Sequence, residues 1–285
     1  MSAPSIGSAS AAPTGPPSPS APPSVAPSAE RGPTDPAGPR PPWIRDDGAS
    51  LRAQVIADRW SVRGAAKVTG NVEVDTVEID GALSIGGTLR ARRLTVHGAF
   101  EVLGMAQVAE RVELRGPARF SQGFHAGDLD VEGALAVQGP LEVGGLAQIA
   151  GDATLAGDVH CGRLVGSGGL TVPGRLTADR IAFDLHRDSS IGTLLAGSVL
   201  FTRPAAKLPF RLPFIGQERP ILTALRIEAM EVQLEGVTAE LVRAERISLG
   251  PGCHVARVIG PVVAVDPSSH VGPESRSPPP HGISR

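Results

Sequence analysis

A repeat of about 17 residues runs from Trp60 to about Ser198, and it limits the chain to one kind of architecture. Each repeat contains three pairs of apolar residues, and one residue separates the two members of a pair. In one repeat the pairs are Val77/Ile79, Leu83/Ile85 and Leu89/Ala91. The repeats begin at Trp60, Val77, Leu94, Val112, Leu129, Leu146, Leu164 and Ile181.

Apolar pairs of this spacing predict short strands with one buried face, because successive side chains of a strand point to opposite sides. Three such strands per repeat form a triangular coil, whose corners need backbone dihedrals that glycine adopts without steric cost. Glycines stand fifth or eleventh in most repeats, as at Gly81 and Gly87. We therefore predict an all-β fold, a single parallel β-helix in which each repeat forms one coil. The repeats Leu94 to Arg111 and Leu146 to Arg163 carry one extra residue each, which we expect to form a bulge.

The composition indicates a tail on each side of this coil. Thirteen of the 27 prolines precede Trp43, in a stretch with too few aliphatic residues to offset the entropy of ordering. We predict disordered tails at residues 1–50 and 273–285, and a β-helix domain at residues 51–272. The pattern is interrupted at about residues 200–222, where FTRPAAKLPFRLPFIGQERPI predicts a loop or short helical excursion from one corner.

The sequence lacks the signals that are typical of several classes of protein. No stretch of about 20 apolar residues could span a membrane, and Met1 to Pro13 lacks the basic and apolar parts of a secretory signal. Cys161 and Cys253 are widely separated, as expected in a reducing cytosol. A net charge of −2 does not indicate the basic surface that binds nucleic acid. The Gly86–Gly87 pair is not followed by the lysine of a nucleotide-binding loop. We expect a cytoplasmic protein without nucleic acid, nucleotide or cofactor.

The histidines and cysteines do not indicate a catalytic or metal site. No histidine has a Ser, Asp or Glu partner at a spacing typical of a general base, so we expect no enzyme activity. A relative of the six-residue-repeat acyltransferases is the weakest alternative, since 17 is not a multiple of six. His160–Cys161 and Cys253–His254 lie on distant coils, whereas a zinc site needs four converging ligands. We therefore predict no metal site.

Two stretches resemble a known family. The glycine-cornered repeat VEIDGALSIGGTLRARR, Val77 to Arg93, resembles the coils of bactofilins, the bacterial polymer-forming cytoskeletal proteins. Ile227 to Gly272, with ISLGPGCHVARV at Ile247 to Val258, resembles the end of a bactofilin subgroup in which a basic, apolar insertion interrupts the coils. The resemblance covers Leu51 to Gly272. It implies that the β-helix is right-handed and that coil ends self-assemble into non-polar filaments without nucleotide. Some bactofilins carry a hydrophobic N-terminal membrane-targeting motif, and Met1 to Ser50 contains none.

Two groups of residues are candidates for contacts with other molecules. The ends of a solenoid present strand edges and half-covered apolar side chains, which must be capped or paired. Trp43 or Trp60 could cover the N-terminal end of the core, and otherwise we expect a second subunit at the ends. The residues assigned to this polymer interface are Trp60, Val62, Val263, Val265 and Val271.

The insertion interleaves apolar and basic side chains, which either dock on a membrane surface or partner protein or fold back on the solenoid. The residues assigned to this loop are Phe201, Arg203, Lys207, Phe210, Arg211, Phe214 and Ile215. The sequence as a whole predicts a homopolymeric scaffold that positions envelope or motility machinery. The alternative is a monomeric or dimeric β-helical adaptor, bound through the insertion to the inner face of the membrane or to an envelope protein.

Overall fold

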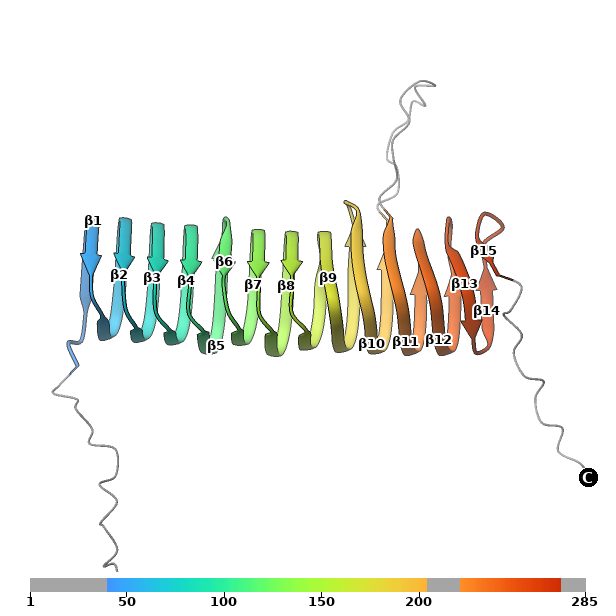
Figure 1. Cartoon of the computed structure of the whole chain (residues 1–285), viewed down its shortest axis with the longest axis horizontal. Coiled ribbons are helices and arrows are strands. Elements are labelled where there is room, and N and C mark those ends of the chain that lie inside the picture. Colours follow the sequence, from blue (N-terminus) through green and yellow to red (C-terminus); the bar gives the residue numbers. More distant parts are fainter. Residues whose placement is uncertain (1–39, 204–220, 273–285) are drawn as a thin grey trace, which may run out of the picture. The chain divides into compact units, whose positions relative to one another are not determined.

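The computed structural model describes residues 40–203 and 221–272, and all regular elements of these residues are strands. The strands pair in parallel and stack as a β-solenoid of about 12 turns, which confirms the predicted fold class (Figure 1). They follow chain order through one sheet, with β6 and β14 beside the main path. Their bounds are β1 Ile44–Arg52, β2 Val55–Val68, β3 Val72–Ile85, β4 Leu89–Val102, β5 Ala106–Arg115, β6 Ala118–Phe120, β7 Phe124–Val137, β8 Leu141–Leu155, β9 Val159–Leu185, β10 Ser189–Thr202, β11 Leu222–Leu234, β12 Val237–Leu249, β13 His254–Ile259, β14 Val262–Val265 and β15 His270–Val271.

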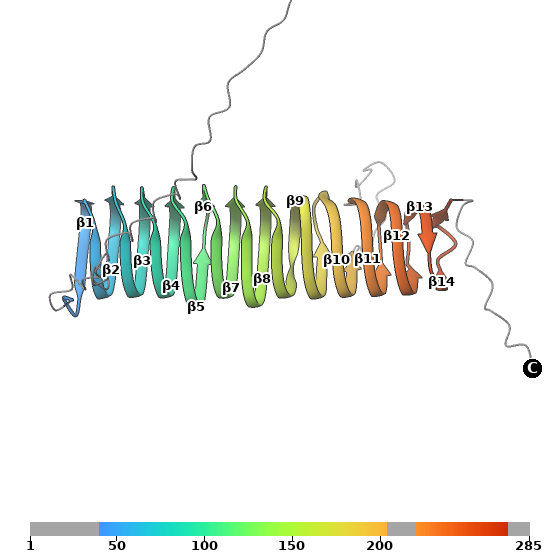
Figure 2. The ribbon, with the colours of Figure 1, turned by 60° about the horizontal axis from the view of Figure 1, so that its bottom comes forward.

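Each coil buries its apolar pairs in the interior, as the repeat predicts. The pairs of β3 are exposed by 2% or less, and they are Val72/Val74, Val77/Ile79 and Leu83/Ile85. Equivalent side chains stack between coils, so that Val77 pairs with Trp60 on one side and Leu94 on the other. The strands are longer than the three short ones predicted, because the ladder continues around two corners and β3 is unbroken from Val72 to Ile85. The coils stack along one axis (Figure 2), and their inward side chains form one apolar core along the solenoid.

Glycine forms one corner with positive φ in most coils, as predicted for the fifth position. Gly81 has φ of 139°, and a Cβ built there would lie 2.0 Å from the carbonyl oxygen of Gly64 in the preceding coil. The eleventh position requires glycine for a different reason. Gly87 is not among the positive-φ glycines, and it lies so close to Gly70 that a Cβ would be 2.6 Å from the carbonyl carbon. That corner requires glycine for the close approach of two backbones.

One of the two predicted extra residues lies elsewhere. The first falls at Ala109–Glu110, inside the predicted repeat, where the register between β4 and β5 shifts. The second falls before Leu146, because Leu129 pairs with Ala147 after a register shift that follows Ala126. Ala147 therefore begins the next repeat and is buried, whereas Leu146 is half-exposed at a corner. Because both residues are apolar, their spacing alone did not identify the inward one.

The boundaries of the solenoid also differ from those predicted. It begins with β1 at Ile44 rather than at residue 51, so the predicted N-terminal tail is too long. The insertion lies between Thr202 and Leu222, the ends of β10 and β11, and residues 204–220 are outside the described part. The coils after the insertion are shorter, since the step from Leu222 to its partner Val237 spans fewer residues than the step from Val77 to Leu94. The predicted tails 1–39 and 273–285 are outside the described residues.

Candidate functional site

The N-terminal end of the solenoid is covered by a coil whose inward positions are mostly polar. β1 continues the inward columns of β2: Ile44 pairs with Trp60, Asp46 with Val62, Ser50 with Ala66 and Arg52 with Val68. Three of the four inward positions of β1 thus carry polar side chains where β2 has apolar ones. Among the described residues, β1 has a strand neighbour on one side only.

Asp46 is the centre of a hydrogen-bond network at this end. Its carboxylate is 7% exposed and accepts two hydrogen bonds from the Arg52 guanidinium, from Nε at 2.8 Å and Nη2 at 2.6 Å. The Trp60 indole Nε1 also donates to Asp46, at 2.9 Å. The Arg52 hydrogen bonds lower the pKa of Asp46 below its ordinary value of 3.8; partial burial opposes this shift, and the Trp60 hydrogen bond adds to it. The carboxylate is therefore held ionised against the last apolar layer of the core.

This network changes the assignment of the N-terminal interface residues. Trp60 and Val62 are 1% and 0% exposed beneath β1, so they are core residues and cannot contact a second subunit in this structure. Trp43, the other candidate for a cover, is 58% exposed. The cover is β1 itself, and the sequence did not reveal it because an inward Asp and Arg do not match an apolar repeat.

The C-terminal end is apolar and more open. Val262 and Val265 pair with Ile247 and Leu249 and so continue two inward columns, yet they are 38% and 46% exposed because no described coil lies beyond them. Val271 pairs with Val255 and packs partly against the core. Val263 is the extra residue of a register shift and is 68% exposed. The predicted residues Val263, Val265 and Val271 thus all lie on the final coil.

Two members of the predicted docking loop are described, and both fold back on the solenoid. Phe201 lies in an inward column between Phe183 and Leu234 and is fully buried. The Arg203 guanidinium lies over Gly236, where it occupies the space that a Cβ would fill. Both side chains therefore pack against the coils. The other members, Lys207, Phe210, Arg211, Phe214 and Ile215, lie outside the described residues.

Histidines have partners that the sequence did not reveal, because these partners lie one coil away. His97 Nδ1 is 3.1 Å from Asp80 Oδ1, and His125 Nδ1 is 2.8 Å from Glu142 Oε2. We predict no partner at a spacing typical of a general base, and these two partners lie at the spacing of one full repeat instead. A separation of one full repeat was the signal, since it places two outward side chains on neighbouring rungs.

His160 and Cys161 are adjacent in the sequence but point to opposite faces of their strand. Cys161 is 1% exposed within the core, whereas His160 is exposed. Burial, with a smaller contribution from the charge of Asp179, raises the pKa of the Cys161 thiol to about 12. Cys253 is also buried, and its Sγ donates a hydrogen bond to the Leu234 carbonyl at 3.3 Å. As placed, no three or more His, Cys, Asp or Glu side chains of the described residues could hold a metal ion.

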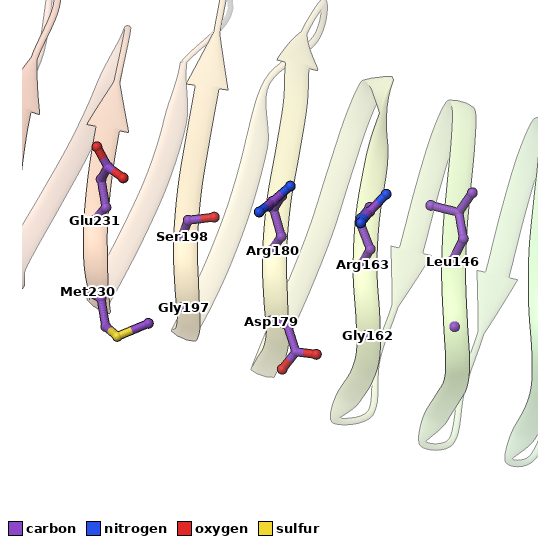
Figure 3. Close-up of a pocket in the computed structure, with 10 residues that line it drawn as sticks. Leu146, Gly162, Arg163, Asp179, Arg180, Gly197, Ser198, Met230 and Glu231 are labelled. Atoms are coloured by element: carbon purple, nitrogen blue, oxygen red, sulfur yellow. The ribbon is translucent and has the colours of Figure 1, made fainter.

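A shallow groove follows one corner of the middle coils. Arg163 and Arg180 lie side by side on neighbouring coils, and Ser198 and Glu231 continue the same row (Figure 3). Glycines at Gly145, Gly162 and Gly197 leave the groove open. No histidine lines this groove, so Ser198 has no imidazole base beside it.

No helix in residues 40–203 or 221–272 is long and apolar enough to cross a membrane. Comparison of the chain with models of protein families, with characterised proteins and with solved structures finds no match.

Proposed function

We propose that this protein is a bactofilin-like scaffold, which self-assembles end to end through its solenoid and positions envelope or motility machinery. The observation that carries the proposal is the C-terminal coil. Its inward side chains Val262 and Val265 continue two columns that are buried in the two coils below, at Ile247/Leu249 and Val232/Leu234, yet they are themselves exposed. A further coil from another molecule would cover them as Ile247 and Leu249 are covered within this one.

The backbone at this end supports the same proposal. Within the described residues, β14 pairs only with β12 and β15 only with β13, so their outer edges have no strand partner. Unpaired edges beside exposed apolar side chains are the usual template for pairing with another chain. The resemblance of Val77–Arg93 and Ile227–Gly272 to bactofilins points in the same direction.

The proposal is tested by assembly of the purified full chain without nucleotide. We expect wild-type protein to pellet in a concentration-dependent manner and to form filaments in negative-stain electron microscopy. The variant Val263→Asp/Val265→Asp places two carboxylates on the final coil and should remain in the supernatant with unchanged far-UV circular dichroism.

A matched control carries the same charge change on the side of the rod. Ile56 and Leu103 are exposed apolar residues, in β2 and just after β4, distant from the final coil, and Ile56→Asp/Leu103→Asp should assemble as the wild type does. Short single rods in the wild type, or equal pelleting of the end variant and the wild type, would remove the C-terminal end as the assembly contact.

A further inference from the structure

A ladder of outward side chains crosses the middle of the solenoid and brings together two histidines and a glutamate. His125 pairs in register with Glu142, and Glu142 pairs with His160, so the three residues lie on consecutive rungs of β7, β8 and β9. Consecutive rungs of a parallel ladder are about 4.8 Å apart, and side chains in register point to the same face. Among these residues, His125 and Glu142 are already in contact at 2.8 Å.

The same three residues line one hollow on the outer face of the solenoid. One side of this hollow is low, because the residues two positions after His125 and Glu142 are the glycines Gly127 and Gly144. A Cβ at Gly144 would have no atom closer than 3.7 Å, so there is open space beside Glu142. A ligand can therefore approach His125, Glu142 and His160 from the solvent.

From this geometry we infer that His125, Glu142 and His160 form a binding site for a divalent transition metal ion of the zinc class. Two imidazoles and one carboxylate are a common ligand set for such ions, and a fourth position then remains for water. His125 and His160 are two rungs, or roughly 10 Å, apart at the backbone. Two imidazoles that lean toward the rung between them span this separation with Zn–N bonds of about 2 Å.

The side chains need a small rearrangement to bind, because they do not surround a common point as placed. His160 is exposed, so its rotation displaces no core contact. His125 and Glu142 have side-chain exposed fractions of 37% and 57%, which leaves both free to turn outward. The nearest cation on this ladder, Arg90, is separated from His125 by the uncharged Gln107.

Metal binding at this site would join three consecutive coils by bonds that are additional to the backbone ladder. The probe is zinc chloride, added to full-length untagged protein and followed by isothermal titration calorimetry in a buffer that does not bind zinc. We expect one zinc ion per chain from this site. Either His160→Gln or Glu142→Gln should weaken its binding by about tenfold or more.

Two control variants separate this site from other histidines. His254 and His270 are also exposed, and they pair in register on the last two coils. Their ladder has no third ligand, because the residue that pairs with His254 on the other side is Thr238. His254→Gln/His270→Gln should leave the zinc affinity of the three-rung site unchanged, as should His97→Gln. Circular dichroism checks that each variant is folded.

A second readout uses stability rather than binding heat. Zinc should raise the melting temperature of the wild type and of His97→Gln, and it should raise that of His160→Gln less at the same concentration. The inference is overturned if the wild type binds no zinc, if His160→Gln and Glu142→Gln bind as tightly as the wild type, or if binding is lost only in the His254→Gln/His270→Gln variant.

Discussion

Alanine substitution along the column of corner glycines should have very different effects at two positions that share a backbone conformation. Gly48 and Gly98 belong to the same column and have φ of 86° and 134°. A Cβ at Gly48, in the first coil, would have no heavy atom within 4 Å. A Cβ at Gly98, in the middle of the rod, would lie 2.0 Å from the carbonyl oxygen of Gly81. The pair therefore separates backbone strain from steric overlap.

The expected magnitudes follow from these two terms. Positive φ costs an alanine about 1–3 kcal/mol at either position, and we expect this whole loss for Gly48→Ala. At Gly98 the contact is more than 1 Å shorter than the 3.4 Å of ordinary van der Waals contact, so the two coils must separate locally. Each ladder hydrogen bond that breaks adds about 1 kcal/mol. We expect Gly98→Ala to lower the free energy of unfolding by more than about 4 kcal/mol.

Urea unfolding followed by far-UV circular dichroism measures both losses. The mid-rod variant should also lose cooperativity, because a defect between coils uncouples the coils on its two sides. If Gly48→Ala and Gly98→Ala lose the same free energy within error, the close approach of the coils does not control this position, and the steric part of the reasoning is refuted.

Three further predictions concern the buried groups Asp46 and Cys161. Asp46→Ala should cost about 1–3 kcal/mol, because it leaves the Trp60 indole N–H without its acceptor and Arg52 without its partner, and urea titration of the variant measures it. Since the folded-state pKa of Asp46 lies below 3.8, the ionised carboxylate stabilises the fold above that pH, and this stabilisation is lost as pH falls through the lower folded-state pKa. The stability of Asp46→Asn should not show this loss in acid, and a stability–pH profile identical to that of the wild type would contradict the assignment. The Cys161 thiol, whose pKa is raised to about 12, should react with a thiol reagent at pH 8 only after unfolding, and rapid labelling of the folded protein would show that it is accessible.

The sequence predicted the coil well because one local rule repeats along it. Alternation of apolar residues depends only on the period of a strand, and pairs such as Val77/Ile79 and Leu83/Ile85 are buried as predicted. The rule fails where an inward position is polar. Asp46 and Arg52 occupy columns of Val62 and Val68, and a search for apolar pairs therefore places the start of the solenoid at residue 51 rather than at Ile44.

The candidate sites were harder to predict, because they depend on the register between coils. His125 and Glu142 are one repeat apart in the sequence, and they become neighbours only when the two coils are aligned. Bulges of one residue alter that alignment, as the pairing of Leu129 with Ala147 shows. A ladder contact can thus be deduced from sequence only after every bulge has been located, and apolar residues on both sides of a corner, such as Leu146 and Ala147, leave its position undetermined.

The difference between the two ends makes the assembly experiment interpretable. Substitution of a fully buried residue such as Val62 by Asp would place an unpaired charge in the core, and loss of assembly would then be inseparable from unfolding. Val265 already has an exposed fraction of 46%, and Val263 one of 68%, so their carboxylate variants remain hydrated in the free subunit. A charge at either position becomes costly only when another surface covers it. Loss of filaments with unchanged stability would therefore report contact at this end of the solenoid.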